Sequence, residues 1–476
     1  MIGSRRPVCQ LAPPWIDKQG GRADSGRVRT IVVVISDLHL GGDEGFEMCS
    51  SVGRRRLAEL VRWAGERRSP SQEVQLVING DVVDFLAERG PDGTFAAFTA
   101  DEDQAARKLA GVFTRTEEIW EALARFAASN ELTILLGNHD VELSLPAVRR
   151  RLRDRLGRVE LIDDNRAFTR GPLLIEHGNR YDVWNAVPHD SLRHLRSRLS
   201  RRMPPTEYNP PPGSELVVRV MNELKASYAF VDLLKPETGA VLPILAALGA
   251  TTWRSARRAI YQAARRAWRG RQFGPLQEPR DDDLIAASTG EPPGDPADAA
   301  AFRLADEIAA TAGDSDLISS ATDPPPPPGL LLRALRAFTA KDSSFDIGHE
   351  DRIYLDPARA RIEAGFQAVV FGHTHLAKDL PLGSGRYLNS GTWADLMVLP
   401  REVLSGPIAA AEPALVAFLD DVRANRLDRV RRPVPTFVEV QLGPGDQLLG
   451  CATQFFDEGG TVAPLTGDGL LARLQR

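Results

Sequence analysis

Five short segments of this chain carry the Asp, Asn and His side chains that commonly bind transition metals. They are Ser36-Asp37-Leu38-His39, Asn79-Gly80-Asp81, Gly137-Asn138-His139-Asp140, Glu176-His177-Gly178 and Gly372-His373-Thr374-His375. Carboxylate, amide and imidazole groups without a thiolate suit Mn²⁺, Fe, Zn²⁺ or Co²⁺ rather than a structural zinc site. Residues i and i+2 of a strand point to the same side, so Asp37 and His39 can reach one ion together. The segments therefore predict a metal site.

Each segment follows a short apolar run that reads as a strand buried on both faces of a mostly parallel sheet. The runs are Ile31–Ile35, Val74–Ile78, Leu132–Leu136, Leu173–Ile175 and Ala368–Phe371. Ligands of open α/β sheets lie outside the carboxyl ends of the strands, which is where all five segments fall. We expect one rim of the sheet to gather them.

Between these runs, apolar residues recur at helical spacing, as expected for the helices that connect parallel strands. Helices are predicted over Arg54–Arg67 and Asp101–Ser129. A third is predicted before Ala368, with Asp356 as N-cap, Pro357 in the first turn and Gly365 just past the end.

The ordered motifs resemble those of the calcineurin-like metallophosphoesterases. The matches are Asp37-Leu38-His39, Gly80-Asp81-Val82-Val83-Asp84, Gly137-Asn138-His139-Asp140, His177-Gly178 and Gly372-His373-Thr374-His375. The resemblance covers roughly residues 30–184 and 350–395. It implies an α/β fold of layered sheets flanked by helices, an αββα sandwich, with a helical insertion.

The resemblance also implies a centre of two divalent transition metal ions (Mn, Fe, Zn or Co, with Mn favoured) and a bridging hydroxide that attacks a phosphoester or pyrophosphate bond. Asp37, His39 and His375 would hold the first ion, Asp81 would bridge, and Asn138, His177 and His373 would hold the second. His139 would be a catalytic acid or charge stabiliser oriented by Asp84. Metal ions of this kind lower the pKa of bound water to about 7.

Several polar residues near the motifs have a structural alternative. Asp84 could instead cap the following helix, and Arg180 and Asp182 could either contact a phosphate or hold a loop. A surface helix face is favoured over substrate contact for His189 and His194, and a solvated position for His349. Asn389 and Trp393 are expected to secure a strand.

The alternation of strands and helices breaks between about 184 and 350. We predict a leader over 1–29 and a phosphoesterase core over 30–184 plus 350–400. A mainly helical insertion or cap covers 185–349, with helices at Glu215–Leu234, Thr252–Trp268 and Asp298–Ala312. A C-terminal extension over 401–476 has a helix at Pro413–Arg423 and a strand at Thr436–Leu442 that would close a sheet edge.

Composition narrows the class of protein and of partner. The chain has 476 residues and a net charge of −5, which disfavours a protein that coats nucleic acid non-specifically. Its three cysteines are too few for a disulfide framework. We expect a cytoplasmic protein without a transmembrane segment, acting on a small phosphorylated substrate. The basic face of residues 252–269 could contact a membrane, although packing of its alanine-rich face inside the cap is favoured.

The remaining alternatives concern substrate and function class. UDP-2,3-diacylglucosamine pyrophosphatases are shorter and usually have Arg at the position of His139, and protein phosphatases have Arg-Gly where Phe85-Leu86 stands. We therefore favour a phosphohydrolase or phosphodiesterase for a small metabolite, nucleotide or lipid headgroup. A non-catalytic scaffold and a nuclease are the alternatives; a scaffold would be expected to have lost ligands that this chain retains.

Overall fold

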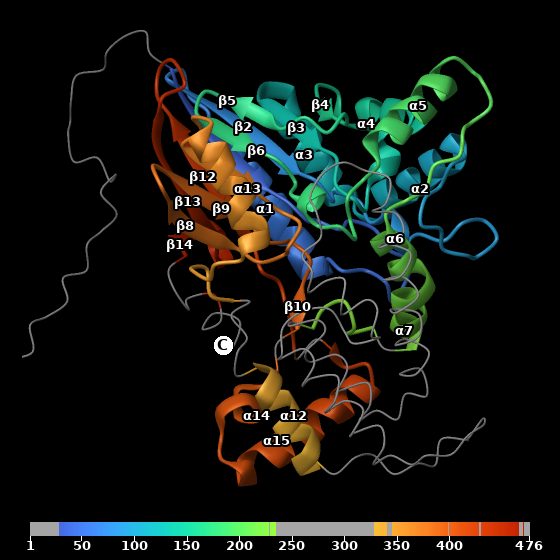
Figure 1. The fold of residues 1–476 in the computed structure, drawn as a ribbon, viewed down its shortest axis with the longest axis vertical. Helices are drawn as coiled ribbons and strands as arrows, with labels where there is room; N and C mark the ends of the chain where they lie inside the picture. The colour runs from blue at the N-terminus through green and yellow to red at the C-terminus, as the bar shows by residue number, and fades with distance from the viewer. Residues whose placement is uncertain are drawn as a thin grey trace, which may run out of the picture.

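Two β-sheets stacked face to face form the centre of the molecule (Figure 1). The computed structural model describes residues 28–227, 229–234, 328–339, 345–397, 399–427, 430–465 and 470. The larger sheet has the order β14-β13-β12-β1-β2-β3-β4 and the smaller has the order β5-β6-β7-β9-β8. The fold class expected from the motifs is confirmed, whereas the single sheet drawn from the apolar runs is wrong.

The five predicted strands are divided between the two sheets. Strands β1 (Arg29–Ile35), β2 (Gln72–Asn79), β3 (Glu131–Leu135) and β4 (Glu160–Ile162) run parallel in the larger sheet. In the smaller sheet, β6 (Leu173–Ile175), β7 (Ala368–Phe371) and β9 (Gly385–Asn389) run parallel. Its edges are β5 (Phe168–Arg170) and β8 (Lys378–Leu382).

Alternation along β1 explains why two layers can pack on it. Val32 and Val34 face the smaller sheet and pack with Ile175 and Val370, whereas Ile31 and Val33 face the helices. Successive side chains of a strand point to opposite faces, so an unbroken apolar run is what a doubly covered strand needs.

The outer face of the larger sheet is covered by α1 (Ser51–Glu66), α2 (Glu102–Arg115), α3 (Glu117–Ser129) and α4 (Pro146–Leu156). The single helix predicted over Asp101–Ser129 is therefore two. Thr116 separates them with φ −129° and ψ 36°, and its hydroxyl donates to Val112 O and accepts from Trp120 Nε1. These local bonds stabilise a non-helical residue where apolar spacing alone indicated continuity.

Helix α13 (Arg352–Glu363) covers the outer face of the smaller sheet. The predicted start at Asp356 is wrong: Asp351 is the N-cap and accepts from Ile353 N at 3.0 Å, and Pro357 lies inside the helix. The predicted end is confirmed, because Gly365 follows the helix with φ +108°. Proline is favoured at the first turn but does not forbid an extra turn before it.

The C-terminal strands extend the larger sheet. Strand β12 (Thr436–Leu442) pairs antiparallel with β1, and β13 (Leu448–Phe456) and β14 (Val462–Pro464) follow it. The predicted strand at Thr436–Leu442 has the expected bounds, but it does not close the sheet edge, because β13 and β14 continue the sheet beyond it.

A second hydrophobic core lies apart from the sandwich. It is formed mainly by α12 (Pro328–Thr339), α14 (Arg401–Ser405) and α15 (Ile408–Arg423), with the short pair β10 (Leu396–Met397) and β11 (Arg431–Arg432) leading to it (Figure 1). Part of the insertion thus packs with part of the C-terminal extension.

The first part of the insertion begins with α5 (His189–Ser200). The helix predicted at Glu215–Leu234 is shorter: α6 (Pro212–Leu216), the π-helical stretch η4 (Val217–Met221) and α7 (Asn222–Ser227) precede a turn. The helices predicted at Thr252–Trp268 and Asp298–Ala312, the basic face of 252–269 and residues 1–27 lie outside the described residues. Within those residues, no helix has the length and apolar content that crossing a membrane requires.

Candidate metal centre

The metal-ligand candidates converge at the carboxyl ends of strands from both sheets. Asp37, His39, Asp81 and Asn138 follow β1, β2 and β3, and His177, His373 and His375 follow β6 and β7. Two groups suited to a cation form there, with the ligand atoms of each within 4.8 Å of one another: Asp37, His39 and His375, and Asp81, His177 and His373. The convergence predicted from the motifs is present, but the rim belongs to two facing sheets.

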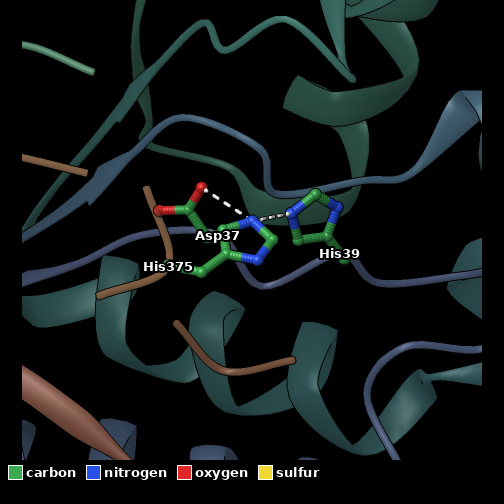
Figure 2. A group of neighbouring side chains, drawn as sticks. All are labelled: Asp37, His39 and His375. Carbon is green, nitrogen blue, oxygen red and sulfur yellow. Dashed lines mark hydrogen bonds and ion pairs between the residues drawn. The ribbon is translucent and has the colours of Figure 1, made fainter. Parts of the chain in front are cut away.

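The first group brings three ligand atoms to one point. His375 Nε2 lies 3.0 Å from His39 Nε2 and 3.4 Å from Asp37 Oδ1. Figure 2 shows this nitrogen between the carboxylate and the other ring. Such separations suit ligands of one ion, because bonds of about 2.0–2.2 Å place neighbouring ligand atoms roughly 3 Å apart.

Asp81 lies between the two groups. Its Oδ2 is 3.3 Å from His177 Nε2 and 3.9 Å from His39 Nε2. Its Oδ1 accepts from the backbone N–H of His139 at 2.8 Å, which fixes the carboxylate. One oxygen of Asp81 therefore faces imidazoles of both groups, as a bridging ligand would.

Hydrogen bonds outside the centre orient the ligands of the second group. His177 Nδ1 lies 2.6 Å from Asn79 O, and because a carbonyl only accepts, Nδ1 carries the proton and Nε2 faces the site. His373 Nε2 lies 3.1 Å from Asp182 Oδ2, which leaves Nδ1 for an ion. Asn138 donates through Nδ2 to Asn185 Oδ1 at 3.4 Å, which leaves its carbonyl oxygen free. Metal-ligating side chains are commonly held by such outer partners.

Unpartnered buried atoms test whether these residues fit a cation. Asp37 Oδ1, Asn138 Oδ1 and His177 Nε2 are all buried and make no hydrogen bond. Buried polar atoms are normally paired, since leaving one unpaired costs about 1–3 kcal/mol. Acceptor atoms without a hydrogen bond thus occur in both ligand groups, and their chemistry fits bound metal ions.

The charge state of the carboxylates also fits cation binding. Burial would raise the pKa of Asp37, but the nearby imidazoles of His375 and His177 lower it. Burial likewise opposes ionisation of Asp81, yet His177 and His139 hold its pKa well below the usual range. For His39, burial and the charge of His139 lower the pKa to about 3, so the ring is in the neutral form that binds metals.

Five of the seven ligand candidates have left-handed backbone conformations. The φ values are +54° for Asp37, +43° for His39, +51° for Asp81, +69° for His373 and +61° for His375. Residues other than glycine adopt this region at an energetic disadvantage, and such residues cluster at functional sites. The chain thus turns sharply after each strand, which aims these side chains inward.

Glycines flank the ligands because the site leaves no room for a side chain. A Cβ added to Gly80 would lie 2.5 Å from His177 Cγ, one on Gly137 would lie 2.7 Å from Asp81 Cγ, and one on Gly372 would lie 2.6 Å from Ser36 Oγ. In the structure they let the ligand side chains themselves approach the backbone.

His139 and Asp84 form a pair beside the ligands. His139 Nδ1 lies 3.1 Å from Asp84 Oδ1, and Asp84 makes no cap bond to the following turn η1 (Phe85–Ala87), which disfavours the capping alternative. Burial lowers the pKa of His139, but the charges of Asp84 and Asp81 outweigh it and raise the pKa to about 10. The His139 side chain is 17% exposed, so the ring is not fully closed off from solvent.

Asp84 also belongs to a third group with cation-binding geometry, together with His39 and His139. His39 Nδ1 lies 3.8 Å from Asp84 Oδ2. His39 also belongs to the first group, and His139 Nδ1 contacts Asp84 directly, so Asp84 is in a position to orient His139.

Asp140 is a residue of the site whose role the sequence did not reveal. Its buried carboxylate accepts from Val82 N and Gly137 N, each at 2.7 Å, and so joins the loops that carry Asp81 and Asn138. Burial and the charge of Asp81 raise its pKa to about 7. The motif contained Asp140, but nothing in the spacing distinguished a loop clamp from a ligand.

The other polar candidates resolve into structural contacts. Asp182 orients His373, whereas Arg180 donates to Asn165 Oδ1 at 2.7 Å and pairs with Glu176 at 3.2 Å, so both hold loops. Asn389 donates to Gly372 O at 2.8 Å and secures the loop after β7.

Among the described residues, the histidines outside the motifs belong to none of the cation-binding groups. His349 and His194 are exposed, as expected. His189 is half-buried rather than solvated; its Nδ1 makes no hydrogen bond, and burial together with nearby Arg180 lowers the pKa of the ring to about 4. Trp393 is fully buried against the first core.

Comparisons with known proteins agree with this architecture. The family model described as calcineurin-like phosphoesterase matches residues 31–230. No curated protein matches the chain.

Two solved structures are among those similar to it. One is described as a candidate 5′-nucleotidase from Staphylococcus aureus in complex with alpha-ketoglutarate, at 12% identity and a TM-score of 0.30, covering 94% of this chain. This chain spans only 58% of that protein. The other is phosphopantetheinyl hydrolase from Mycobacterium tuberculosis, at 14% identity and a TM-score of 0.24, covering 77% of this chain and 90% of that one.

Proposed function

We propose that this chain, whose residues 31–230 match the calcineurin-like phosphoesterase family, is a metal-dependent hydrolase of phosphoester or pyrophosphate bonds with a two-ion centre. The observation that carries the proposal is the position of Asp81, one carboxylate oxygen of which faces imidazoles of two separate ligand groups. Asp37, His39 and His375 would hold the first ion, and Asn138, His177 and His373 would hold the second. Asp81 would serve both.

Such ions supply Lewis acidity toward the phosphoryl group and toward water. Mn is our first choice of metal, because the ligand set contains hard oxygens and imidazoles and no thiolate. The protein residues bind the phosphoryl group at the rim of the two sheets and exclude water from its inner side, where Asp37 and Asp81 are buried.

His139 holds a proton at Nε2 and delivers it to the leaving oxygen. Asp84 accepts from Nδ1, which fixes the ring and stabilises its protonated form. General acids of this kind contribute typically about 10²–10⁴ to the rate. The benefit is greatest for a poor leaving group, because such a group needs the proton before the bond breaks.

The substrate is a small phosphorylated metabolite, nucleotide or lipid headgroup, and the insertion selects it. The start of the insertion contacts the site: Asn222 is buried and donates to Leu86 O in η1 at 2.8 Å. Burial would raise the pKa of Asp84, but the charges of His139 and, more weakly, of Lys225 lower it to about 2. Residues next to Asp84 are therefore in contact with the element assigned to selectivity.

The test combines metal analysis with a panel of phosphomonoester, phosphodiester and pyrophosphate substrates. The wild-type chain is expected to bind two metal equivalents and to hydrolyse at least one class. Asp81→Asn should lose metal and activity together, because Asp81 faces both groups. Asp154→Asn, an exposed change on α4, is the matched control and should retain both. Full metal content and turnover in Asp81→Asn would contradict the bridging role.

A further inference from the structure

A basic groove separate from the metal centre lies between α4 and α5. Figure 1 places the two helices side by side, and they are in contact. The groove is a cavity of about 530 Å³ whose walls carry five arginines. They are Arg149, Arg150 and Arg153 from α4 and Arg193 and Arg196 from α5. Ser197 and Ser200 add hydroxyl groups. We call this cavity the arginine groove.

The arginine groove carries an excess of positive charge. Asp163 lies 2.9 Å from Arg149 and 2.8 Å from Arg196, and Asp190 lies 3.0 Å from Arg193. Among the described residues, Arg150 and Arg153 have no acidic partner. Five guanidinium groups thus face two carboxylates, one of which, Asp190, is 95% exposed and therefore well screened by water.

Part of the groove is held rigidly by the fold. Arg196 is 13% exposed and also donates to Asp163 O at 2.9 Å. Its guanidinium is therefore held by both the backbone carbonyl and the carboxylate of Asp163. Arg149 shares the same carboxylate from the opposite helix. A preorganised guanidinium loses little side-chain entropy when it binds a ligand, and its planar fork matches the oxygens of phosphate.

We propose that the arginine groove binds a small phosphate-bearing ligand of nucleotide size. The volume lies within the range of about 300–1,000 Å³ that is usual for small-molecule sites. A single groove of this size on a chain of net charge −5 fits a compact polyanion better than an extended nucleic acid, which needs a longer basic track. None of the seven metal-ligand candidates lines the groove, so the proposal does not depend on the proposed hydrolase activity.

The test is calorimetric titration of the full chain with α,β-methylene-ADP. In this probe a CH₂ group joins the two phosphorus atoms, and that linkage resists hydrolysis. The double variant Arg150→Gln/Arg153→Gln should bind this probe roughly tenfold or more weakly, because it removes two unpaired charge-assisted contacts. Arg55→Gln/Arg62→Gln removes the same charge from exposed positions on α1 and should retain wild-type affinity. Asp81→Asn should also retain it, because the metal centre is not the binding site.

Three results would overturn the proposal. Loss of binding in Asp81→Asn but not in the groove variant would place the probe at the metal centre. Equal weakening by the groove variant and the α1 variant would indicate general electrostatic attraction. A single-stranded oligonucleotide whose binding depends on Arg150 and Arg153, with no binding of the nucleotide probe, would assign the groove to nucleic acid.

Discussion

Substitution of Gly137 by alanine should disable the metal centre without removing any ligand. An added Cβ would lie 2.7 Å from Asp81 Cγ, whereas ordinary van der Waals contact begins at 3.4 Å. Asp81 must then move by about 0.7 Å or more, and a metal bond tolerates only about 0.2 Å. We expect the variant to lose most of its bound metal and its activity. Forcing one methyl into a packed site should also destabilise the fold by about 1–3 kcal/mol.

The measurement is metal stoichiometry after gel filtration, together with thermal unfolding and turnover. Gly111→Ala on α2 is the matched control, because there the nearest atom is the mobile end of Arg115 at 3.1 Å. That change should leave metal content intact and stabilise the helix by about 0.5–1 kcal/mol. Full metal content and unchanged turnover in Gly137→Ala would refute the steric reasoning and the bridging position of Asp81.

The remaining predictions concern the acid, a ligand support and a buried carboxyl. His139→Ala should retain metal but slow turnover by about 10²–10⁴, most for poor leaving groups, and equal loss for good and poor leaving groups in a substrate series would exclude the acid role. Asp182→Ala should weaken metal binding by about 10–100-fold, since His373 loses its partner. A competitive chelator titration measures this affinity, and an unchanged value would contradict the supporting role of Asp182. Burial raises the pKa of Glu142 from 4.5 to about 7, so its protonated carboxyl contributes fully to the free energy of unfolding below pH 4.5. This contribution, on the order of 3 kcal/mol at most, is lost as the pH rises toward 7. Glu142→Gln should flatten that dependence in urea unfolding at pH 5 and pH 7.5, and an identical slope in both proteins would contradict it.

The strands that carry the site were predictable because their burial leaves a plain signature. Leu173–Ile175 and Ala368–Phe371 have the bounds read from their apolar runs. Their assignment to a second sheet was not readable from those runs, because a strand covered on both faces looks the same in either sheet. Only the family resemblance implied two layers.

Local hydrogen bonds account for the errors at helix ends. Thr116 interrupts a continuous apolar stripe, and Asp351 rather than Asp356 begins α13. In both cases several polar side chains could make the hydrogen bond to the backbone that ends or begins a helix, and the sequence does not show which one does. The supporting contacts of Asp140 and Asp182 escaped prediction for a related reason, since they depend on loops that meet only after the sheets pack.

The ligand candidates are divided between the two stacked layers, four following the larger sheet and three following the smaller. Cations bound there would crosslink the two sheets at this rim, because each sheet supplies ligands. Stability of the whole chain should then be tied to metal supply, since a ligand that binds only the assembled form draws the equilibrium toward it. Starvation for metal would thus lower the amount of intact protein as well as its turnover.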